Sequence, residues 1–168
     1  PLYPPSTMAE EEVAWDSTVQ EWLIDEGNCV AGALGDPATG TFYAAAPVEG
    51  EAGWAMVYKE PYEQMLAQED GSEKAETIDE SAIMKEVAEG KRPAKGFWVA
   101  GEKYTITRQE EDEVEGKAVK VTIAGRPKKG IVIYTTEASI VMGMFDEAKV
   151  ATQNIGNCRK VVAAFTEY

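Results

Sequence analysis

The sequence predicts an α+β domain built around one antiparallel sheet. Five short segments in the second half are rich in β-branched and aromatic residues, and no helical pattern separates them. Amphipathic helical patterns lie near both ends of the chain, as expected when helices cover one face of a sheet. The length of 168 residues fits one domain that buries roughly 70% of its unfolded surface.

The chain is predicted to open with a leader followed by a helix. Residues 1–13 are expected to be a flexible leader, and 1–7, which are proline-rich, are expected to be an added tail preceding a natural start. The single domain then covers residues 14–168. A helix is predicted over Ala14–Asp25, where four apolar residues recur at helical spacing: Trp15, Val19, Trp22 and Leu23.

Two strands and a short helix are predicted next. Val30–Leu34 and Thr41–Ala46 are apolar runs separated by a turn-rich segment that contains proline and glycine. A helix near Gly53 is expected to cover Trp54 and Val57. These elements predict a strand pair followed by a helical connection.

An acidic insertion and a third helix follow. Gln68–Thr77 is polar, acidic and interrupted by Asp-Gly-Ser, which predicts a surface excursion or hairpin. Thr77 through Glu80 fits a capping box, with Ser81 as an alternative cap, and Gly90 is the expected stop. The helix between them should present one apolar stripe.

The second half predicts an antiparallel meander and a closing helix. Its five strands are expected at Phe97–Ala100, Tyr104–Arg108, Ala118–Ala124, Ile131–Tyr134 and Ile140–Met144. The acidic run Gln109–Glu115 is predicted to be the solvated tip of a hairpin near 109–116. The last helix is expected to occupy Ala151–Tyr168.

Charge is distributed unevenly along the chain. Its 16 Lys and Arg residues all lie at or after Lys59, whereas 20 of its 30 carboxylates lie within residues 1–90. A chain with a net charge of −14 does not have the basic footprint that nucleic-acid binding requires. Cations concentrated in the second half favour one basic face that binds an acidic protein partner.

The residue inventory argues against catalysis. The chain has no histidine, which is the usual general base and a common metal ligand. Two cysteines far apart in sequence, Cys29 and Cys158, predict neither a zinc site nor a disulfide framework, and favour a reducing cytosol. Gly96–Tyr104 only superficially resembles a phosphate loop, because its interior is bulky and apolar. We therefore expect no enzyme, metal site or cofactor.

Several segments, in this order and spacing, resemble profilins, most closely those of apicomplexan and related alveolate protists. The matching segments are Trp15–Leu23, Gly40–Ala46, Gly53–Glu60, Gly96–Tyr104, Lys128–Gly130, Phe145–Glu147, Gly156–Arg159 and Glu167–Tyr168. The resemblance implies a central antiparallel sheet with the N- and C-terminal helices packed together on one face. It also implies a cytoplasmic, cytoskeleton-associated and monomeric protein that binds monomeric actin and regulates its polymerisation.

The resemblance further implies two binding sites. An actin face would use Lys128, Lys129, Gly156, Arg159 and Lys160. A groove for Pro-rich segments of formin-like proteins would use Trp15, Tyr43 and Tyr168, and phosphoinositides are a further expected ligand. Many profilins carry an aromatic residue where this chain has Thr18, which predicts a weakened groove.

A different class of function stays open from the sequence. Scaffolds of the longin or roadblock type also set helices against an antiparallel sheet and act in trafficking assemblies. Such a scaffold would present a long unpaired edge strand or a dimer surface, whereas aromatic residues combined with a late basic cluster favour the actin-binding reading.

Overall fold

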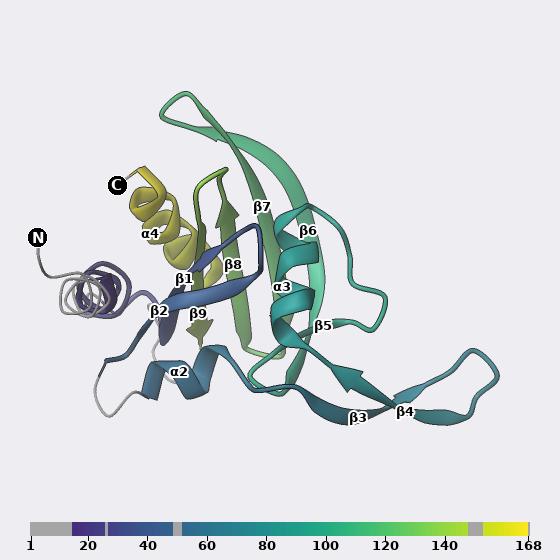
Figure 1. Ribbon diagram of the computed structural model, residues 1–168. Coiled ribbons are helices and arrows are strands. Elements are labelled where there is room, and N and C mark those ends of the chain that lie inside the picture. The colour runs from purple at the N-terminus through teal and green to yellow at the C-terminus, as the bar shows by residue number, and fades with distance from the viewer. Residues whose placement is uncertain (1–14, 26, 49–51, 148–152, 168) are drawn as a thin grey trace, which may run out of the picture.

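The computed structural model describes residues 15–25, 27–48, 52–147 and 153–167 (Figure 1). The main sheet contains β1 (Ala31–Asp36), β2 (Thr41–Ala46), β5 (Phe97–Val99), β6 (Glu102–Val114), β7 (Lys117–Arg126), β8 (Lys129–Thr135) and β9 (Ile140–Asp146). Its strand order is β2-β1-β9-β8-β7-β6-β5, and every pair is antiparallel. The predicted α+β class and the meander of the second half are confirmed.

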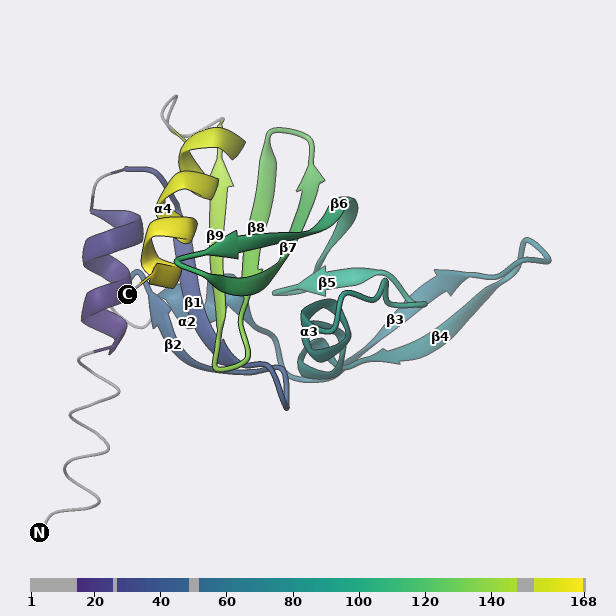
Figure 2. The ribbon, with the colours of Figure 1, turned by 90° about the horizontal axis from the view of Figure 1, so that it is seen from above.

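Helices at the two ends of the chain pack against each other on one face of this sheet. The first helix is α-helical over residues 15–19 and widens into the π-helical turn η1 (Gln20–Ile24), where the Asp25 amide donates to the Gln20 carbonyl. The last helix, α4, is Ile155–Glu167. Figure 2 shows the two helices side by side. This confirms the expected pairing of terminal helices.

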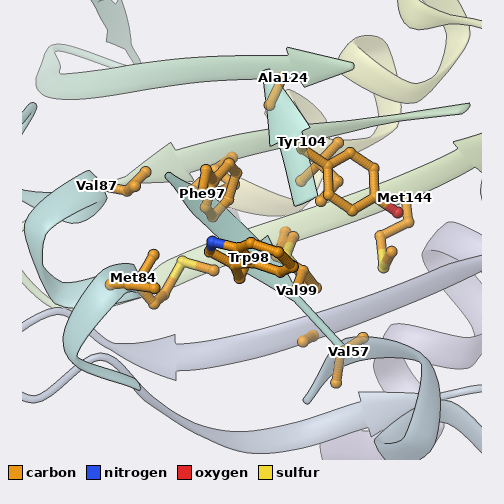
Figure 3. Packing of buried hydrophobic residues seen from close by; sticks show 14 of the residues in the cluster. Val57, Met84, Val87, Phe97, Trp98, Val99, Tyr104, Ala124 and Met144 are labelled. Carbon is orange, nitrogen blue, oxygen red and sulfur yellow. The ribbon is translucent and has the colours of Figure 1, made fainter. Parts of the chain in front are cut away.

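Two apolar cores lie on opposite faces of the sheet, because alternate side chains of each strand point to opposite sides. In β8, Val132 and Tyr134 join the core beneath the terminal helices, whereas Ile131 and Ile133 join the other core. The second core packs α2 (Ala52–Val57) and α3 (Glu80–Ala88) against β5 and its neighbours (Figure 3).

The acidic insertion belongs to a two-stranded hairpin that is longer than predicted. Its strands are β3 (Tyr62–Ala67) and β4 (Glu73–Ile78), and the hairpin extends away from the main sheet (Figure 1). The sequence predicted an excursion over Gln68–Thr77 and missed β3. Its base is anchored in the core, where Ile78 is fully buried and Tyr62 is partly buried, and Leu66 farther out also packs against this core.

The start of α3 differs from the capping-box prediction. Asp79 is the N-cap, and its carboxylate accepts hydrogen bonds from the amides of Ser81 and Ala82. Thr77 is paired within β4 and therefore cannot cap the helix. Gly90 follows the helix with a left-handed φ of 83°, as the predicted stop requires.

Two boundaries in the second half also need correction. The run Gln109–Glu115 was predicted to be a hairpin tip, but β6 and β7 stay paired out to Val114 and Lys117, so only Glu115 and Gly116 turn the chain. Buried Val114 supplies an apolar anchor that the acidic composition concealed. The last helix, predicted from Ala151, begins at Ile155, and residues 151 and 152 lie outside the described residues. Within the described residues, no helix is long and apolar enough to cross a bilayer.

Candidate functional site

The first candidate surface lies where the first helix, packed against α4, meets β2, and we call Trp15 and Tyr43 the aromatic surface. Both side chains are more than a third exposed, at 37% and 38%. The Trp15 ring lies 6.5 Å from that of Phe165 on α4, and the Trp22 ring lies 5.8 Å from Phe165. Phe165 is therefore the aromatic contact that joins α4 to the first helix.

A hydrogen bond joins the helix that carries Trp15 to the strand that carries Tyr43. The Asp16 carboxylate accepts a hydrogen bond of 2.9 Å from the Ala45 amide, which fixes the start of the first helix to β2. Tyr43 lies two residues before Ala45, at a bulge opposite the Leu34–Gly35 step. Burial, with a contribution from Asp36, raises the pKa of Tyr43. The third predicted groove residue, Tyr168, lies outside the described residues.

The second candidate surface is a group of cations at one end of the sheet, which we call the basic end. It consists of Lys59, Arg126, Lys128 and Lys129, which lie near the β5–β6 and β7–β8 turns. Glu102 joins its members, since its carboxylate lies 3.7 Å from the Arg126 guanidinium and 3.9 Å from the Lys129 ammonium. These ion pairs are solvent-exposed and contribute little to folding, so the cations can bind an acidic partner.

Neighbouring contacts complete the basic end. The Arg126 guanidinium donates to the Lys103 carbonyl at 2.8 Å. Lys128 occupies the β7–β8 turn with a left-handed φ of 63° and accepts a backbone hydrogen bond from Glu147. A pocket of about 200 Å³ lies alongside and includes Tyr104, whose pKa is raised to about 12 by burial and by Glu102.

Lys128, Lys129 and Gly156 of the predicted actin face lie toward the same end of the molecule. Lys129 pairs with Asp146 at the end of β9. The Asp146 amide donates to the Gln153 side chain, and α4 begins two residues later, which places the exposed Gly156 near this end. These three residues come from two segments that are distant in sequence, and the structure places them toward the same end of the sheet.

Arg159 lies farther along the sheet and is held by this chain's own residues. Its Nε donates to the Tyr134 hydroxyl at 2.9 Å, and its Nη2 lies 2.8 Å from the Glu110 carboxylate and 3.6 Å from that of Asp112. Glu110, Val121 and Tyr134 are neighbours across three strands. Arg159 therefore attaches α4 to the long β6–β7 hairpin.

Lys160 lies on a different side of α4 from this network. Together with Glu21, Trp22, Val161 and Ala164 it lines a groove of about 400 Å³ between the first helix and α4. The five predicted actin-binding residues thus divide among the basic end, the Arg159 network and this groove. Because Arg159 and Lys160 are adjacent in sequence, the sequence did not indicate that their surroundings differ.

The sequence did not predict the role of Glu80, a carboxylate that accepts several hydrogen bonds in the described part of the chain. It is buried and accepts four hydrogen bonds, from Lys59, Tyr62, Ala100 and Gly101. Its position in the first turn of α3 suggested an ordinary capping role, and no sequence pattern links it to residues 100–101. In the described part of the chain, no group of three or more potential metal ligands is assembled.

Comparisons with known proteins agree with one family. The family model described as Profilin matches residues 13–168. A profilin of Plasmodium falciparum is 30% identical over 165 residues, covering 93% of each chain. A profilin of Plasmodium berghei is 26% identical over 164 residues, covering 94% of this chain and 93% of its own.

Solved structures show the same fold at lower sequence identity. Schizosaccharomyces pombe profilin has a TM-score of 0.59 at 19% identity, over 92% of this chain and 94% of its own. Acanthamoeba castellanii profilin IA has a TM-score of 0.54 at 18% identity, over 91% and 96% of the two chains. The agreement includes the sheet and both terminal helices, because nearly the whole chain is covered.

Proposed function

The chain belongs to the profilin family and is an actin-binding regulator of actin polymerisation, and we propose that its basic end is the surface that contacts the actin monomer. The observation that carries this proposal is the exposed cation group around Glu102 in a chain that is otherwise strongly acidic. Actin is acidic, so opposite potentials favour encounter and fix the relative orientation of the two proteins.

The remaining predicted residues have different proposed roles at this interface. Gly156, an exposed residue in the first turn of α4, has no side chain, which permits close approach of a partner backbone at this position. Arg159 supports the surface by holding α4 against β6 rather than by offering a free cation. Lys160 lies at the edge of the interface, toward the first helix.

A second proposed activity is the binding of Pro-rich segments, such as those of formin-like proteins, at the aromatic surface. A polyproline helix loses little entropy on docking, and half-exposed aromatic rings such as Trp15 and Tyr43 suit its flat faces. Thr18 supplies no aromatic wall one turn after Trp15. Binding weaker than that of a fully aromatic groove is therefore expected, and a proline decamer should change Trp emission in wild type but not in Trp15→Ala.

Phosphoinositides are a further proposed ligand, since the basic end offers several cations to a phosphorylated headgroup. The proposed compartment is the cytoplasm, where monomeric actin is present. The longin or roadblock alternative gains no support, because the family model covers the chain from residue 13 to its end.

The test of the actin surface is a double charge reversal, Lys128→Glu with Lys129→Glu. Titration calorimetry against monomeric actin should show affinity reduced by about tenfold or more, equivalent to about 1.4 kcal/mol. The matched control is Lys91→Glu with Lys117→Glu, which changes net charge equally at exposed positions away from the basic end. Equal losses in the two variants would show that only net charge matters and would reject the assigned surface.

A further inference from the structure

Glu80 connects three segments of the chain through one buried carboxylate. Its side chain accepts the Lys59 amide at 3.0 Å, the Tyr62 hydroxyl at 2.9 Å, and the amides of Ala100 and Gly101 at 2.7 and 2.8 Å. Only 4% of the residue is exposed. A buried carboxylate is tolerated where several donors replace its hydration, and each of these donors lies outside Glu80's own helix.

The β5–β6 turn has a backbone conformation suited to this carboxylate. Ala100 and Gly101 have φ values of 52° and 84°, so two successive residues are left-handed. Left-handed backbone is unfavourable for alanine and persists where the surroundings compensate. Consecutive amides in such turns form a concave anion-binding nest. Here the anion is the Glu80 side chain.

The turn held by Glu80 leads directly into the basic end. Glu102, the residue after Gly101, is the carboxylate that pairs with Arg126 and Lys129. A side chain added at Gly101 would meet the Lys59 side chain, so Lys59 lies along the same turn. The turn therefore positions the carboxylate that pairs with two of the basic-end cations, and Glu80 itself accepts the backbone amide of a third, Lys59.

We propose that Glu80 is a positioning residue for actin binding, holding the β5–β6 turn so that the basic end presents its cations in one arrangement. This inference rests on the proposed actin surface. It assigns to Glu80 a role different from that of a first-turn helix carboxylate, because the side chain accepts hydrogen bonds from residues 59, 62, 100 and 101.

The first experiment replaces Glu80 by Gln, which keeps the size but presents an amide NH₂ to a cluster of donors. Amide hydrogen exchange at Ala100 and Gly101 should accelerate by about tenfold or more, and actin affinity should fall by about tenfold. Glu80→Asp is the second variant, since it keeps the charge but withdraws the oxygens from their donors. Glu86→Gln, an exposed change on the same helix, is the control and should alter neither quantity.

A double-mutant cycle separates positioning from general loss of structure. In the Lys128→Glu/Lys129→Glu background, Glu80→Gln should reduce actin affinity by less than about twofold, because the surface that it positions is already disabled. A persisting tenfold loss would contradict the proposal. Unchanged amide exchange at Ala100 and Gly101 in both Glu80 variants would reject the positioning role of Glu80 and would leave the assigned actin surface standing. Unchanged actin binding in the double reversal itself would reject the assigned actin surface, and with it the link from Glu80 to actin.

Discussion

At the scale of single residues, Arg159 and Lys160 are sequence neighbours with different surroundings. Resemblance placed both on the actin face, and the cationic character of both is evident from the sequence. Their partners are not, because the contacts of Arg159 with Glu110 and Tyr134 join residues 49 and 25 positions apart. The resemblance assigned Trp15 and Tyr43 to a groove for Pro-rich ligands, and both side chains are more than a third exposed in the structure, so that assignment stays a prediction.

Charge reversal should separate the two cations by their effect on folding. Arg159→Glu removes a hydrogen bond to Tyr134 and places a carboxylate beside Glu110, so it should lower the free energy of unfolding by about 2 kcal/mol or more. Lys160→Glu should change it by no more than about 0.5 kcal/mol. Urea unfolding followed by Trp fluorescence measures both. Similar stabilities for the two variants would mean that the Arg159 network contributes little.

The two cysteines, which the sequence places far apart, meet in the core beneath α4. Cys29 Sγ lies 3.5 Å from Cys158 Sγ, and both residues are essentially unexposed. Gly143 makes room for them, since a side chain there would crowd both sulfurs and Val162. The hydrogen bond that the Cys158 thiol shares with Cys29, together with burial, raises the pKa of Cys158 well above its ordinary value.

This raised pKa predicts that stability falls on the alkaline side. The Cys158 thiol of the unfolded chain ionises at about pH 8.5, whereas folded Cys158 keeps its proton, so its contribution is complete below about pH 8.5 and is lost as pH rises further. The urea midpoint should therefore fall between about pH 7.5 and 9.5. The Cys29→Ala/Cys158→Ala variant should show a smaller fall, and an equal fall would assign the dependence to other groups.

At the scale of elements, the helices and strands with a strong local pattern of residue types were the ones predicted correctly. The strands of the meander were predicted because β-branched runs alternate with turns and each run is buried. β3 was missed because Tyr62–Ala67 contains Glu, Gln, Met and Leu, which favour helix, and pairing with β4 makes it a strand. The cap of α3 was misplaced because Thr77 and Asp79 are both good caps, and strand pairing decides between them.

The outer part of the β3–β4 hairpin should be dispensable for folding. Replacing residues 67–73 by Asn-Gly keeps the base, in which Tyr62 packs on Trp98 at 6.5 Å and Ile78 is buried, and it also keeps Leu66, which packs against the core. Thermal unfolding followed by circular dichroism should show the free energy of unfolding changed by less than about 1 kcal/mol.

Tyr62→Ala is the matched variant at the base of the hairpin. It should cost about 2 kcal/mol or more, because it removes both the ring contact with Trp98 and the hydrogen bond to Glu80. If the shortened hairpin fails to fold while Tyr62→Ala is stable, the anchoring region has been assigned to the wrong end of the hairpin.

At the scale of the whole molecule, several cations from the second half of the sequence lie at one end of the sheet. Arg126 and Lys129, from β7 and β8, pair with Glu102, whereas Lys59 from the α2–β3 link lies along the neighbouring Gly101 and Lys128 occupies the β7–β8 turn. The sequence predicted that cations would lie together on one face. Which cations do so depends on the sheet topology, which places Arg159 beside Glu110 and Lys160 in the groove beside the first helix. Contacts between residues so distant in the chain cannot be predicted from a local sequence pattern.

Actin assembly followed by pyrene fluorescence tests the central claim most directly. Increasing amounts of the protein should slow spontaneous polymerisation in the range of about 1–30 µM, because bound monomers are withdrawn from nucleation. The Lys128→Glu/Lys129→Glu variant should need about tenfold more protein for the same slowing. The absence of slowing by the wild-type protein at tens of micromolar, the order of weak-complex affinities, would contradict the account.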